Sequence, residues 1–239
     1  MSAILQEYEL CDHEMQMYRD ILPEFKKMIN QNNNNNKSKS SRIFPDTVYV
    51  DYNNNVIILE DLVELGFVMA DRSDGLDLIH AKMVLVNLAK FHAASMVANE
   101  KQPNIFKNFN TGMFNRKTSG LSPFHLNNLD ACANQIAEWG GNYKYYADKL
   151  RNMKGTLIEN AIKVFDTNEG DLVALLHGDL WVNNVMYKYD KDNQPEDVVI
   201  VKVFLLNFFP IYRKMCRFCF RLIFNFVAGH HPQSTSFIS

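Results

Sequence analysis

Residues 172–189 have the sequence LVALLHGDLWVNNVMYKY, with His177–Asp179 at its centre. The residues before this motif, Leu172–Leu176, form an apolar run, and Asn184–Tyr189 after it is rich in apolar and aromatic side chains. Two such runs around a glycine are typical of two strands joined by a tight polar loop. Gly178 suits the turn because it lacks the Cβ atom that penalises positive φ.

The polar residues of this loop have the spacing that phosphoryl transfer requires. An aspartate such as Asp179 can accept a hydrogen bond from an acceptor hydroxyl, and Asn184, five positions later, can offer an oxygen to Mg²⁺. Protein kinases place the same two roles at the same spacing after a histidine. Asp179 and Asn184 could instead cap backbone amides of a β-turn. The strand–loop–strand context favours the catalytic interpretation.

The longer string HGDLWVNNVMYKYD resembles the catalytic loop of the aminoglycoside phosphotransferase and choline kinase-like superfamily. Within it, the chain is most similar to insect ecdysteroid kinase-like (CHK-domain) proteins, over Leu5–Val201. The resemblance implies a protein-kinase-like α+β fold of two lobes. It also implies ATP and Mg²⁺ as cofactors and transfer to an alcohol, an ecdysteroid- or choline-like small molecule. Asp179 would then be the catalytic base, His177 would order the catalytic loop, and Asn184 would be a metal ligand.

The composition is that of an ordinary globular protein. The 239 residues suit one domain or two small lobes, and 47% are hydrophobic and 22% charged. A net charge of −2 gives no sign of a nucleic-acid partner. The cysteines form no disulfide framework. Because no apolar run could span a membrane and the first residues do not suit a signal peptide, we expect a cytoplasmic protein.

The first segment, Leu5–Met28, has apolar residues at helical spacing, and Pro23 predicts a break or a new helix start within it. Its string HEMQMYRDILPEF resembles the small-lobe helix that lies beside the nucleotide. Glu14 is the best match for the glutamate that pairs with the phosphate-binding lysine, although an exposed helix carboxylate is the plain alternative. The upstream strands that carry this lysine in the family have no counterpart in the sequence, so we expect an incomplete N-lobe.

An asparagine-rich stretch, residues 31–41, precedes a predicted hairpin of Thr47–Tyr52 and Val56–Leu59. The resemblance makes the following residues the hinge between the lobes. Backbone groups of Glu60, Asp61 and Leu62 would then hydrogen-bond the adenine edge. The alternative is that the strand simply ends there and Asp61 caps the next turn.

Three helices are predicted before the catalytic loop: His80–Ala98, Leu126–Trp139 and Tyr143–Phe165. His92 lies within the apolar stripe of the first, so we expect a core histidine with a buried hydrogen bond. In a choline kinase-like fold, aromatic residues of the second and third helices would help to shape the acceptor pocket. For any single one of these aromatic residues, packing in the core is the favoured alternative. These residues are Trp139, Tyr145 and Tyr146.

The family pattern breaks after a predicted strand, Asp197–Val201. The family carries a metal-binding aspartate there, but position 202 is lysine, which repels Mg²⁺ and removes carboxylate ligands. From Lys202 onward there are five basic residues and no acidic ones, whereas residues 1–201 carry a net charge of −7. We therefore divide the chain into a partial N-lobe (1–62), a truncated C-lobe with the catalytic loop (63–201) and a divergent tail (202–239).

The divergent tail leaves other functions open. Cys216, Cys219 and His230–His231 could be drawn together as a zinc site, but no zinc-finger pattern surrounds them. Because Lys202 replaces the aspartate, we expect impaired kinase activity. The alternative is a catalytically inactive fragment or pseudokinase that acts as a binding module.

Overall fold

The computed structural model describes residues 9–33, 42–109, 114–117, 119–202 and 207–210. Its helices and small sheets fit the predicted α+β class, while the two-lobe arrangement and the boundaries of the three predicted segments stay predictions. Of the tail from position 202 onward, only Lys202 and residues 207–210 belong to the described part. The cysteine and histidine residues considered for a zinc site lie outside it.

The N-terminal segment starts a new helix beside Pro23, which is one of the two predicted outcomes. Helix α2 (Leu10–Gln16) passes into a π-helical turn, η1 (Met17–Ile21), and then into α3 (Leu22–Asn33). The amide of Leu22 bonds to the carbonyl of Met17, the i→i−5 contact of a π turn. Pro23 therefore lies in the first turn of α3, where its missing N–H costs least, and of the two predicted alternatives, a break or a new helix start, the structure shows the second.

The predicted hairpin is confirmed. Strands β1 (Thr47–Asp51) and β2 (Val56–Leu59) pair antiparallel. Asn55 takes a left-handed φ of 52°, as expected of a turn asparagine. Asp51 accepts hydrogen bonds from the amides of Asn53 and Asn54 and so closes the turn.

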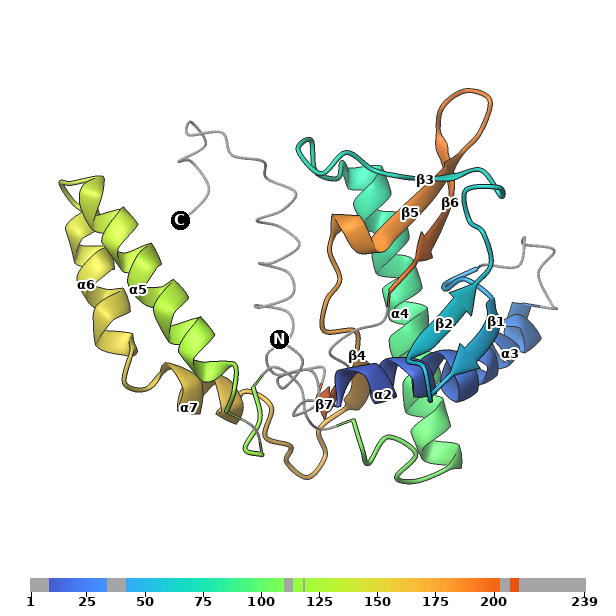
Figure 1. The fold of residues 1–239 in the computed structure, drawn as a ribbon, viewed down its shortest axis with the longest axis horizontal. Helices are drawn as coiled ribbons and strands as arrows, with labels where there is room; N and C mark the ends of the chain where they lie inside the picture. The colour runs from blue at the N-terminus through green and yellow to red at the C-terminus, as the bar shows by residue number, and fades with distance from the viewer. Residues whose placement is uncertain (1–8, 34–41, 110–113, 118, 203–206, 211–239) are drawn as a thin grey trace.

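Helix α4 (Leu78–Lys101) contains the predicted helix and extends it at both ends. Asp77 begins it by accepting the amide of His80. Two buried polar side chains tie α4 to strands around the candidate site. Asn87 Nδ2 donates to the carbonyl of Val198 at 2.8 Å, and Ser95 Oγ accepts the amide of Leu175 at 3.0 Å. Figure 1 shows α4 running behind the sheets, and α4 contacts both β4 and β6.

Two small sheets carry the rest of the described strands. In the first, β3 (Phe67–Met69), β5 (Val185–Tyr189) and β6 (Pro195–Ile200) lie in the order β3-β5-β6 with antiparallel neighbours. In the second, β4 (Val173–Leu176) pairs antiparallel with β7 (Asn207–Pro210). Strand β3 was not predicted, since three residues show no clear period. The apolar core between these sheets, α3 and α4 includes Phe25, Phe91, Leu175 and Ile200.

Helices α5 (Ser122–Glu138) and α6 (Tyr143–Met153) pack against each other at the left of Figure 1. Helix α7 (Leu157–Lys163) follows them. The single helix predicted over Tyr143–Phe165 is wrong. A turn at residues 154–156 divides it, and Gly155 weakens helix propagation at that point.

The aromatic side chains of this hairpin were expected to pack in a core, and that expectation was also wrong. Trp139, Tyr145 and Tyr146 are 60%, 65% and 55% exposed. Instead they pair along the surface: Trp139 meets Tyr143 edge-on, and Tyr145 meets Tyr146 in the same way. Among the described residues, no helix is both long and apolar enough to cross a membrane.

Candidate active site

The central motif lies in a loop between two strands, as predicted. Strand β4 leads into His177–Asp179, a short 3₁₀ turn (η2, Val182–Asn184) follows, and β5 begins at Val185. Gly178 takes a φ of 76°, a conformation that side chains with a Cβ atom rarely adopt. The chain therefore reverses sharply enough to bring Asp179 and Asn184 together.

His177 is buried and holds the loop from both ring nitrogens. Its Nδ1 accepts the amide of Asp179 at 3.3 Å, and its Nε2 bonds to the carbonyl of Lys202. Because an amide only donates and a carbonyl only accepts, the proton of the neutral ring must sit on Nε2. Burial lowers the pKa of His177 to about 4, so the ring is neutral at physiological pH. These contacts support the predicted ordering role.

Asp179 and Asn184 are in direct contact. Asn184 Nδ2 donates to the backbone carbonyl of Asp179 at 2.7 Å and to its carboxylate Oδ2 at 3.0 Å. The carbonyl contact fixes which end of the amide is nitrogen, because a carbonyl cannot donate. The amide oxygen of Asn184 is therefore the end turned away from Asp179, as a metal ligand or hydrogen-bond acceptor would require.

Lys202 lies beside this pair through its backbone. The amide of Val201 donates to the carbonyl of Asn184 at 2.9 Å, and the next carbonyl, that of Lys202, accepts His177. From the N-terminal helix, the hydroxyl of Tyr18 donates to the carbonyl of Val201 at 2.9 Å. The segment at 201–202 is thus fastened to both the loop and the helix.

Glu14, on α2, belongs to the same electrostatic group. Burial raises the pKa of Glu14 to about 7, while the charge of Lys202 lowers it and that of Asp179 raises it. Burial also raises the pKa of Asp179, against the hydrogen bond from Asn184 and the charge of Lys202, which both lower it. The prediction placed Glu14 opposite a phosphate-binding lysine. In the structure the lysine whose charge acts on it is Lys202.

The family resemblance implies a metal ion, and the side chains around Asp179 offer few ligands for one. Asn184 offers one amide oxygen, and Asp179 offers a carboxylate already engaged by Asn184. Among the described residues, no group of three or more histidine, cysteine, aspartate or glutamate side chains could hold a metal ion. Lys202 adds a positive charge that acts on the carboxyl group of Asp179. Asp179 and Asn184 would be the residues that hold a Mg²⁺ ion here, and the positive charge of Lys202 would oppose its binding.

The predicted hinge residues connect β2 to β3, but their side chains act structurally. Glu60 pairs with Arg42 and accepts the amide of Asp46 at 2.6 Å. Asp61 accepts the amides of Val63 and Glu64, which is the alternative turn-capping role. The side chain of Leu62 is buried. Adenine binding by the backbone of these residues stays a prediction.

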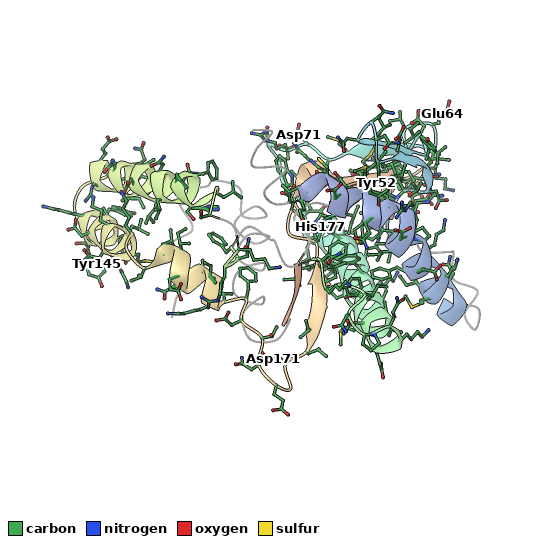
Figure 2. The ribbon with its side chains drawn as sticks, turned by 60° about the horizontal axis from the view of Figure 1, so that its bottom comes forward. Tyr52, Glu64, Asp71, Tyr145, Asp171 and His177 are labelled. Carbon is green, nitrogen blue, oxygen red and sulfur yellow. The ribbon has the colours of Figure 1, made fainter. Side chains whose placement is uncertain are left out.

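Two other features lie apart from the loop. A cavity of about 560 Å³ opens between α3 and residues 42–47, and none of the predicted site residues lines it. Figure 2 shows Tyr145 near one end of the molecule and His177 near its middle, so the structure does not bring this aromatic residue to the loop. His92 is buried as expected, but its Nε2 has no hydrogen-bond partner among the described residues, contrary to the prediction.

Tyr18 contacts the candidate site through its hydroxyl group, a role that the sequence did not predict. Its position in the apolar stripe predicted burial, and the side chain is indeed buried. Its hydroxyl contact with Val201 joins residues 183 positions apart. Helical periodicity indicates which face of a helix is buried but not which distant backbone group a buried hydroxyl meets.

A histidine-ordered loop that aligns an aspartate with an asparagine is the arrangement of a kinase-like phosphotransferase. A family model described as the ecdysteroid kinase-like family matches residues 1–211. The chain belongs to the ecdysteroid kinase-like family. The match continues past Val201 and takes in Lys202 and strand β7. No curated protein matches the chain.

Proposed function

We propose that the loop around Asp179 is the site of ATP-dependent phosphoryl transfer to an alcohol, an ecdysteroid- or choline-like small molecule, and that transfer by this chain is impaired. The observation that carries the proposal is the direct contact between Asp179 and Asn184 in a loop ordered by His177. Membership of a kinase-like family supports the same class of reaction.

In the proposed reaction, the acceptor hydroxyl oxygen attacks the γ-phosphorus of ATP as the bond to the β-phosphate oxygen breaks, and ADP leaves. Asp179 orients the hydroxyl and accepts its proton. A raised pKa suits this role, since a carboxylate of higher pKa is the stronger base. Asn184 holds the Asp179 carboxylate in place through Nδ2, and His177 holds the backbone beneath it.

The impairment follows from the residue at position 202. Phosphoryl transfer depends on cations that stabilise charge developing on the phosphate oxygens. The positive charge of Lys202 opposes a divalent ion beside Asp179, and its side chain offers no carboxylate to hold one. This favours, as the second candidate function, a pseudokinase that binds a nucleotide without transferring its phosphate.

The test is transfer from γ-labelled ATP to a panel of ecdysteroids and choline, with the full chain under single-turnover conditions. We expect slow labelling of an alcohol by the wild-type chain, and a further loss of about 10²–10⁴-fold in Asp179→Asn. Asp192→Asn, which changes an exposed turn carboxylate, is the matched control and should leave labelling unchanged. Nucleotide binding with no labelled product would favour the pseudokinase.

A further inference from the structure

The backbone of Tyr18 is tied to the hairpin sheet at the π-helical turn η1. Within this turn the amide of Leu22 bonds to the carbonyl of Met17, five positions earlier. Pro23, at the same spacing from Tyr18, has no N–H to donate to the Tyr18 carbonyl. The hydroxyl of Thr47, at the start of β1, donates to that carbonyl at 2.9 Å. A contact from outside the helix therefore helps to hold Tyr18 in place.

The side chain of Tyr18 reaches from this turn to the candidate site. The residue is 1% exposed, so the packing around its ring fixes the direction of the hydroxyl. The hydroxyl donates to the carbonyl of Val201 at 2.9 Å, and the amide of Val201 donates to the carbonyl of Asn184 at 2.9 Å. Val201 thus accepts a hydrogen bond from the N-terminal helix and donates one to the backbone of the loop.

The hydrogen bonds continue from Asn184 to Asp179. Asn184 Nδ2 donates to the carbonyl of Asp179 at 2.7 Å and to its carboxylate at 3.0 Å. A displacement of Val201 would therefore move the backbone of Asn184, and with it the amide group that orients the carboxylate. Because hydrogen bonds weaken steeply as their distance and angle depart from the ideal, a small displacement is enough to loosen this contact.

We propose that Tyr18 is a positioning residue for phosphoryl transfer: its hydroxyl holds Val201, and through it Asn184, in the place that orients the Asp179 carboxylate. The inference rests on the proposed function and deepens it by adding a residue of the N-terminal helix to the site. Tyr18 acts through Asn184 and not on the reacting atoms. Loss of the hydroxyl removes a donor from the carbonyl of Val201 and lets the segment that holds Asn184 shift.

Two pairs of variants separate positioning from packing. Tyr18→Phe removes the hydroxyl and keeps the ring. Tyr187→Phe is the matched control, because Tyr187 is also buried and donates its hydroxyl to a backbone carbonyl, that of His80 in the first turn of α4, at 3.4 Å. In the second pair, Thr47→Val removes the hydroxyl that donates to the Tyr18 carbonyl, and Thr47→Ser keeps it.

The experiment is an NMR titration of the full chain, isotope-labelled at its aspartate carboxyl groups, with the Asp179 signal assigned by its absence from Asp179→Asn. The hydrogen bond from Asn184 lowers the pKa of Asp179, so loosening that bond raises this pKa. We expect Tyr18→Phe to raise the pKa of Asp179 by about half a unit or more, and Thr47→Val to raise it less. Tyr187→Phe and Thr47→Ser should leave this pKa at the wild-type value. Thermal melting reports whether each variant is folded.

The outcomes separate this inference from the proposed function. In the single-turnover assay, Tyr18→Phe should label the alcohol about five- to tenfold more slowly than wild type, and Tyr187→Phe at the wild-type rate. An unchanged pKa of Asp179 in folded Tyr18→Phe would overturn the positioning role, as would an equal rise in Tyr187→Phe. Should Tyr18→Phe not fold, equal pKa values of Asp179 in Thr47→Val and Thr47→Ser would overturn it. A wild-type chain that labels no alcohol would refute the proposed function, while the titration would still test the link from Tyr18 to Asp179.

Discussion

The imidazole of His177 joins the loop between β4 and β5 to the carbonyl of Lys202, 25 positions later in the chain. Its other nitrogen accepts the amide of Asp179, so one buried ring connects both sides of the site. The neutral ring satisfies one donor and one acceptor at once, which the doubly protonated ring could not do. We expect the stability of the protein to depend on buried polar contacts of this kind.

Replacement of His177 by alanine should destabilise the protein strongly. The change leaves a cavity, an unsatisfied amide at Asp179 and an unsatisfied carbonyl at Lys202. We expect a loss of about 2–4 kcal/mol in the free energy of unfolding, measured by urea denaturation. The control is His125→Ala, whose ring is only partly buried and should cost less than about 1 kcal/mol. Equal losses in the two variants would contradict the bridging role of His177.

His92 should make the protein less stable in acid. Burial lowers its pKa to about 4 from the ordinary value of 6.5. Between these two pH values the unfolded chain binds a proton that the folded chain does not, so stability falls as pH falls through this window. Replacement by leucine removes this proton-linked loss. The variant should therefore lose on the order of 3 kcal/mol less than wild type between pH 7 and pH 4.

The measurement is urea denaturation of wild type and His92→Leu at a series of pH values. Both proteins should still lose stability in acid, because burial also lowers the pKa of His177. Above pH 7 their difference should be constant, since the ring is then neutral in both states. Parallel stability curves from pH 7 to pH 4 would show that His92 does not titrate as its burial requires.

Glu14 should make the protein less stable as pH rises, whereas His92 makes it less stable as pH falls. Its pKa is raised from 4.5 to about 7, mainly by burial, so the folded state keeps a proton that the unfolded chain releases. The stability from this proton is complete below pH 4.5 and is lost as pH rises to about 7. Glutamine stays neutral, so Glu14→Gln should gain on the order of 3 kcal/mol relative to wild type across this window.

The same denaturation series measures the effect of Glu14→Gln. Glu24→Gln is the matched control, because Glu24 is an exposed glutamate on the following helix. As a surface substitution, it should change the free energy of unfolding at pH 7 by less than about 0.5 kcal/mol. The interpretation fails when the difference between Glu14→Gln and wild type does not change with pH.

Asn87 should be a stability residue and not a binding residue. Its buried amide donates to the carbonyls of Val198 and Arg42, and so ties α4 to β6 and to the segment before β1. Asn87→Ala leaves both carbonyls without this donor and should cost about 2–3 kcal/mol. Asn127→Ala on the exposed face of α5 should change stability by less than about 0.5 kcal/mol. A loss of phosphate binding without a loss of stability would contradict this assignment.

Much of the architecture could be predicted because it is local. The apolar stripe of α4 follows the helical period, and the asparagines before Val56 have the backbone tolerance that a hairpin turn needs. The positions of His177, Asp179 and Asn184 follow from their spacing between two apolar strands. Local signals also left ambiguities: they did not decide whether Pro23 breaks a helix or begins one, and they missed that Gly155 divides an otherwise periodic segment.

The sequence by itself determined the class of the protein and the loop that carries the motif, because both depend on residue type and spacing along the chain. Only the tertiary structure decided that Lys202 acts on Glu14 and Asp179, that Tyr18 bonds to Val201, and that the aromatics of α5 and α6 are exposed. These relations depend on burial and on distances between residues far apart in the chain. A periodic pattern shows that a face is buried, but folding alone decides which charge or carbonyl it meets.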